Sequence, residues 1–89
     1  MKKVREYLQK MIELRNLKAE ISQIMARYPD SSYESEITVG DYGEIILRMD
    51  KIVLLKKSIN LSTTFEEEVL HEIRGLVKDM QVEEGIRNG

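Results

Sequence analysis

The sequence predicts an all-α fold: a small three-helix arrangement in which a long N-terminal helix accompanies an antiparallel helical hairpin. Apolar residues recur at three- and four-residue steps in three separate segments, which is the spacing of one helix face. The second and third segments also begin with helix-capping signatures. With 89 residues, 42% of them hydrophobic and 34% charged, the chain has the size and composition of one domain, 1–89.

The first predicted helix covers about residues 3–28. Tyr7, Leu14 and Ile21 recur every seven residues, and further apolar residues widen this stripe to more than half of the circumference. A helix packed on one neighbour needs a narrower stripe, so we expect this helix to contact two. Pro29 is expected to end it, because the residue before a proline is disfavoured in the helical region.

The segment 29–41 is the predicted connector, since it is polar, acidic and rich in turn-forming residues. A short extended piece at 36–39 is compatible with the sequence, although a lone strand there has no partner inside the chain. Asp41 is a suitable N-cap, and Glu44 three residues later completes a capping box. A helix is therefore expected to start at about residue 42.

The second predicted helix covers about residues 42–59. Seven apolar residues fall on one face at three- and four-residue steps: Tyr42, Ile45, Ile46, Met49, Ile52, Val53 and Ile59. The stretches EIILR and KIVLL within 44–55 are also compatible with two short strands, which remain as the alternative. The helical pattern explains more positions.

The third predicted helix covers about residues 63–84. Thr63 with Glu66, or Thr64 with Glu67, forms a capping box, and acidic residues in a first turn suit the helix dipole. Asn60 is expected to end the preceding helix, and Gly85 to end this one. Because the linker is short, the second and third helices are expected to pack as an antiparallel hairpin, with the first helix lying across both.

The charges alternate along the chain, although the net charge is only −2. Residues 1–29 and 45–59 are mainly basic, whereas 30–44 and 60–89 are mainly acidic. This pattern favours attraction between segments or between copies, and not the one-signed surface of a dedicated nucleic-acid binder. Cysteine is absent and no apolar run is long enough for a membrane span, so we expect a cytoplasmic protein without membrane contact.

The stretch HEIRG raises the question of a metal site. With the preceding KIVLLKKSINLSTTFEEEVL, it resembles metalloproteases of the phage-repressor-cleaving type, a resemblance that implies a zinc-dependent peptidase. Such helices need two histidines one turn apart, but the position of the second ligand is occupied by Gly75, and His71 is the only histidine. We therefore expect no metal, no cofactor and no enzymatic activity, with a degenerate peptidase-like domain as the remote alternative.

Two features of the predicted helices have no role in the core. Leu47, Leu54 and Leu61 follow each other at seven-residue spacing, opposite the core face of the second helix, so either the first helix or a second chain is expected to cover them. His71 and Gly75 share the outer face of the third helix. They form either a solvated surface or a strip where another backbone approaches closely.

The stretches VREYLQ and KIVLLKKSIN resemble the ArpU-like transcription regulators of phages of Gram-positive bacteria. The resemblance implies a mobile-element protein, but the basic recognition helix that would read DNA has no counterpart after Ile73. Nucleic-acid binding is kept as an alternative function. Its candidate phosphate contacts are Arg48, Lys51, Lys56 and Lys57.

The function predicted from the sequence is protein–protein interaction, as an adaptor, inhibitor or assembly factor that self-associates as a homodimer. The candidate contacts lie on the first helix (Tyr7, Leu14 and Ile21) and on the leucine row. Salt separates this prediction from the alternative, because contacts to phosphate weaken steeply with salt, whereas an apolar helix interface is nearly indifferent.

Overall fold

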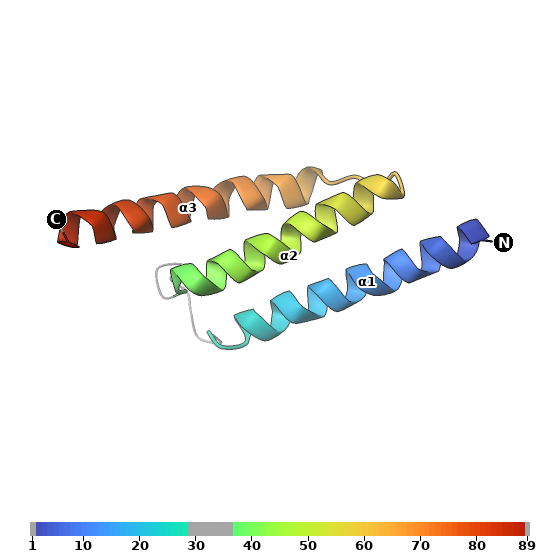
Figure 1. The fold of residues 1–89 in the computed structure, drawn as a ribbon, viewed down its shortest axis with the longest axis horizontal. Coiled ribbons are helices and arrows are strands. Elements are labelled where there is room, and N and C mark those ends of the chain that lie inside the picture. Colours follow the sequence, from blue (N-terminus) through green and yellow to red (C-terminus); the bar gives the residue numbers. More distant parts are fainter. Residues whose placement is uncertain (1, 29–36, 89) are drawn as a thin grey trace.

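The computed structural model describes residues 2–28 and 37–88, which form three helices (Figure 1). They are α1 (Lys2–Met25), α2 (Val39–Ser58) and α3 (Thr64–Asn88). The predicted all-α fold is confirmed, and no strand occurs in these two ranges. The alternative strand pair within 44–55 is wrong because that whole segment is helical. The predicted extended piece at 36–39 also fails, since Val39 already belongs to α2, and Glu36 lies outside the described residues.

Helix α2 begins earlier in the sequence than predicted, at Val39 and not at about residue 42. The N-cap of α2 is Thr38, not Asp41: the Thr38 hydroxyl oxygen accepts a hydrogen bond from the Asp41 amide at 3.1 Å. The Asp41 carboxylate instead binds the residues that follow α1, accepting from Arg27 Nη1 at 2.8 Å and from the Tyr28 hydroxyl. Regular α1 ends at Met25, three residues before the predicted end.

The end of α2 at Ser58 is fixed by a Schellman motif. Asn60 has a φ of 62°, in the left-handed region that asparagine tolerates better than most residues. Its amide donates to the Lys57 carbonyl at 3.2 Å, and the Leu61 amide donates to the Lys56 carbonyl at 2.8 Å. The prediction that Asn60 ends this helix is confirmed.

The start of α3 agrees with the predicted position, but the capping contacts differ. The Thr63 carbonyl accepts from the Glu67 amide at 2.9 Å, and the Thr63 hydroxyl donates to Glu67 Oε2 at 3.0 Å. Glu66, which the capping box would use, instead binds Lys56 on α2. At its other end, α3 continues past Gly85 to Asn88, so the expected stop at residue 84 is wrong.

Helix α2 lies between α1 and α3 (Figure 1). In the described residues no Cα atom of α1 comes within 8 Å of one in α3, so the first helix does not lie across both others as expected. The molecule measures 58 × 23 × 19 Å. In the view down the shortest axis, α1 and α3 lie on either side of α2 (Figure 1).

The hydrophobic core is small and lies along α2. Its buried residues are Ile24 of α1, Ile45, Met49 and Val53 of α2, and Leu70 of α3, with Ile21, Ile46, Val69 and Ile73 packed against them. The radius of gyration is 15.8 Å, whereas a compact chain of this length has about 12 Å. The fold is therefore extended, with much apolar surface left outside the core.

Candidate interaction surface

The N-terminal half of α1 carries exposed apolar residues on a face that no other helix covers. Val4, Leu8, Met11 and Ile12 expose 59%, 55%, 39% and 58% of their surface. We call these four residues the α1 stripe. Their spacing of three to four residues places them on one side of the helix, away from the seam that packs on α2. An amphipathic stripe of this kind is the usual contact surface of a helix that binds another helix.

The predicted contact residues of the first helix differ in exposure. Leu14 is 4% exposed and Ile21 packs against the core, so both are used within the chain. Tyr7, one heptad earlier on the same seam, is 44% exposed. The seven-residue repeat thus begins before the part of α1 that α2 covers, so Tyr7 remains on the surface while Leu14 and Ile21 are packed.

The leucine row of the second helix is only partly as predicted. Leu47 and Leu54 are 52% and 69% exposed, so α1 does not cover them. Leu54 borders a shallow groove between α1 and α2, together with Leu17 and Leu55. Leu61 does not continue the row, because the chain leaves α2 at Ser58. It lines a separate hollow with Met11 and Leu14, beside the α1 stripe.

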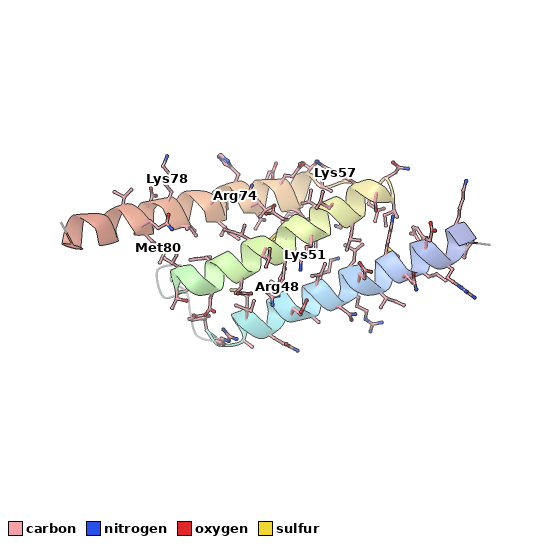
Figure 2. All side chains as sticks on the ribbon, in the orientation of Figure 1. Arg48, Lys51, Lys57, Arg74, Lys78 and Met80 are labelled. Atoms are coloured by element: carbon pink, nitrogen blue, oxygen red, sulfur yellow. The ribbon has the colours of Figure 1, made fainter. Side chains whose placement is uncertain are left out.

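The basic residues considered for nucleic-acid contact lie along α2 (Figure 2), and most of them bind carboxylates. Arg48 Nη1 lies 2.6 Å from Glu44 Oε2, Lys57 Nζ lies 3.1 Å from Glu67 Oε1, and Lys56 binds Glu66. Only Lys51 of the four has no ion pair with a described residue. Neutralised cations on several faces of one helix do not make a basic patch.

The ion pairs between α2 and α3 also lower the pKa values of two carboxyl groups. Burial disfavours the charged form of Glu66, but the hydrogen bond and charge of Lys56, helped by Lys18, hold the pKa of Glu66 below its ordinary value. Hydrogen bonds from Lys57 and Thr63 lower the pKa of Glu67. These carboxylates stabilise the helix hairpin.

His71 and Gly75 lie on the exposed face of α3. His71 lines shallow hollows with Glu67 and Glu68, as expected for a solvated histidine. A Cβ atom added at Gly75 would meet no described atom outside its own helix turn within 4 Å, so this glycine serves no close approach to the described parts of the other helices. Across residues 2–28 and 37–88, no cluster of His, Asp and Glu side chains has the arrangement of a metal site.

Two exposed apolar residues of α3 were not singled out by sequence reasoning. Phe65, the only phenylalanine, is 71% exposed at the start of α3, and Val82 is 54% exposed near its other end. Met25, one of the residues that widen the apolar stripe of the first helix, is 42% exposed at the end of α1. Val82 follows Ile73 by nine residues, so helical spacing already places it opposite the core face of α3. The exposure of Met25 is visible only when the neighbouring helix is placed.

Comparisons with known proteins give no identification: no family model matches the chain, and no curated protein or solved structure is significantly similar to it. The two resemblances drawn from short stretches therefore have no further support. No helix in the described part of the chain has the length and apolar character needed to cross a membrane. The fold and surface together define a class only: a small, open three-helix protein with unpaired apolar helix faces.

Proposed function

We propose that this chain is a protein-interaction module of the cytoplasm that works as a homodimer, with the α1 stripe at the contact. The main support is the amount of surface the monomer exposes. Its accessible surface is 6946 Å², whereas a compact protein of 10.4 kDa exposes about 5,400 Å². The excess of about 1,500 Å² exceeds the roughly 800 Å² that each partner buries in a standard interface.

The chemistry of the α1 stripe supports an apolar contact. Fully burying one large aliphatic side chain contributes about 1.5–3 kcal/mol, and these four are about half exposed. A symmetric dimer buries the stripe twice, for a total of several kcal/mol. Because association itself costs about 4–15 kcal/mol, this gain predicts a dimer that dissociates on dilution unless further surface is buried.

The proposal is tested by measuring solution mass with light scattering across a hundredfold dilution and at two salt concentrations. We expect a dimer that dissociates on dilution. Leu8→Gln should shift the dissociation midpoint at least tenfold upward in concentration. Leu54→Gln is the matched control, since it changes another exposed leucine, outside the stripe, and should leave the midpoint unchanged.

A monomer at all concentrations would refute self-association. A dimer that is weakened by Leu54→Gln but not by Leu8→Gln would place the contact on the exposed face of α2 that carries Leu54, and not on the α1 stripe. Circular dichroism of both variants distinguishes lost association from lost helix.

A further inference from the structure

One hollow of the surface combines an apolar floor with a rim of cations. It has a volume of about 310 Å³ and lies at the end of the molecule where α2 turns toward α3, beside the N-terminal half of α1 (Figure 1). We call its six lining residues the basic hollow: Met11, Leu14, Leu61, Arg15, Lys18 and Lys56. No described acidic residue is among them, so the rim carries only positive charge.

The charges of α1 are segregated around the helix. Its acidic residues Glu6, Glu13 and Glu20 follow each other at seven-residue intervals and therefore share one line along the helix. Glu13 and Glu20 line the groove on the other flank, between α1 and α2. Glu13 and Arg15 directly precede and follow the buried Leu14, so at about 100° per residue they lie on opposite sides of it. The basic hollow is therefore on the flank of α1 that carries no acidic residue of this helix.

Two of the three cations at the rim are unpaired. Lys56 binds the Glu66 carboxylate, but neither Arg15 nor Lys18 forms an ion pair with a described residue. Lys18 adds electrostatic attraction to the same Glu66 carboxylate. Because Glu66 belongs to the first turn of α3, the chain itself already places an acidic helix start beside these lysines. Arg15 and Lys18 remain as partners for carboxylates of another molecule.

The surface changes in character along α1. Tyr7, Met11 and Leu14 lie on one seam at four- and three-residue steps, and Tyr7 and Met11 are 44% and 39% exposed. Arg15 and Lys18 follow on the next turn. An apolar lane thus leads along the helix to a cationic end. A partner helix with apolar residues at i, i+4 and i+7 and with acidic residues at one end is complementary to such a surface.

We propose that the basic hollow, together with Tyr7, binds an acidic amphipathic helix of a partner protein, whose acidic first turn lies over Arg15 and Lys18. The apolar residues of the partner then follow toward Tyr7, so the two helices are antiparallel. This orientation follows from the helix dipole, because carboxylates are favourable in the first turn of a helix and unfavourable in the last.

The apolar floor favours a protein partner over nucleic acid. Nucleic acids are bound by a patch or stripe of many cations, whereas here two unpaired cations border apolar side chains. The proposal does not depend on self-association, although Met11 belongs to both the basic hollow and the α1 stripe.

The test uses a fluorescein-labelled synthetic peptide of about four helical turns, with three glutamates in its first turn and leucines behind them at i, i+4 and i+7. Fluorescence anisotropy measures its binding as the protein is added. A peptide with glutamine in place of the glutamates should bind about tenfold more weakly, because its exposed ion pairs are lost. The reversed peptide, equal in composition, should also bind more weakly. Equal binding of the neutral peptide would overturn the proposal, and equal binding of the reversed peptide would overturn the antiparallel orientation.

Variants of the protein locate the contact. Lys18→Gln should weaken binding of the acidic peptide about threefold, whereas Lys51→Gln should not change it. Lys51 is the matched control because it is an exposed lysine of α2 outside the basic hollow. Leu61→Gln should weaken binding of the acidic and the neutral peptide alike, since Leu61 belongs to the apolar floor. Equal effects of Lys18→Gln and Lys51→Gln would overturn the site, because net charge alone would then account for binding.

Leu8→Gln separates this proposal from self-association. It weakens the proposed dimer but lies outside the basic hollow, so this variant should bind the acidic peptide at least as tightly as the natural chain does. Loss of peptide binding in Leu8→Gln would place the peptide on the α1 stripe and overturn the site. Tighter binding of a labelled oligothymidine than of the acidic peptide would overturn it in favour of nucleic acid. A monomeric natural chain that binds the acidic peptide would refute the homodimer alone.

Discussion

The two halves of α1 have similar apolar content but opposite surroundings. In the C-terminal half, Leu14 and Ile24 are 4% and 5% exposed against α2. In the N-terminal half, Leu8 and Ile12 are 55% and 58% exposed. Helical periodicity therefore determines which residues share a face, but the position at which a neighbouring helix ends determines which of them are buried.

The largest expected effect comes from the same substitution made in each half. Ile24→Ala removes buried methyl groups from the core and should lower the free energy of unfolding by about 2–5 kcal/mol. Ile12→Ala should change it by less than about 0.5 kcal/mol, because the side chain is exposed. Urea denaturation at a concentration where the chain is monomeric measures both. Equal losses would show that the N-terminal half is packed within the monomer.

The next effect concerns the pair Lys56–Glu66, which lies where the packed half of α1 begins. Both side chains are largely buried, at 17% and 10% exposed. Lys56→Ala leaves the Glu66 carboxylate without its partner and should cost about 1–3 kcal/mol in thermal or urea denaturation. Lys51→Ala, at an exposed lysine of the same helix, is the control. A similar loss in both variants would assign the effect to helix propensity.

The same pair predicts a pH dependence. The pKa values of Glu66 and Glu67 are lower in the folded than in the unfolded chain, so their stabilisation is present above the ordinary glutamate pKa of about 4.3. Below that, the unfolded chain binds more protons, and stability falls as pH falls through the folded pKa values. We expect Glu66→Gln to be less stable at pH 7 and to show a shallower loss toward pH 3. An unchanged slope would contradict the role of Glu66.

The smallest expected effect is at Gly75, in the exposed face of α3. Because an added Cβ meets no atom, Gly75→Ala should stabilise the chain by about 0.5–1 kcal/mol through helix propensity. Solution mass should not change, since Gly75 lies outside the α1 stripe. Weaker association would restore the strip of His71 and Gly75 as a contact surface.

Local chemistry was sufficient to predict three helices and the stop at Asn60. It did not distinguish Thr38 from Asp41 as N-cap, because both are good caps and the choice depends on Arg27 and Tyr28, which bind the Asp41 carboxylate. Likewise, Leu47 and Leu54 were correctly placed opposite the core, but their exposure depends on the position of α1. The parts that could not be predicted are contacts between residues distant in the sequence.

The order of the helices in space repeats their order along the chain, and this has a consequence for folding. Contacts join only consecutive helices, so contact order is low and folding is expected within microseconds to milliseconds. Helix α1 can detach without breaking any contact between α2 and α3. Amide hydrogens of α1 should therefore exchange with solvent through a local opening, while those of α2, which holds both neighbours, should exchange last.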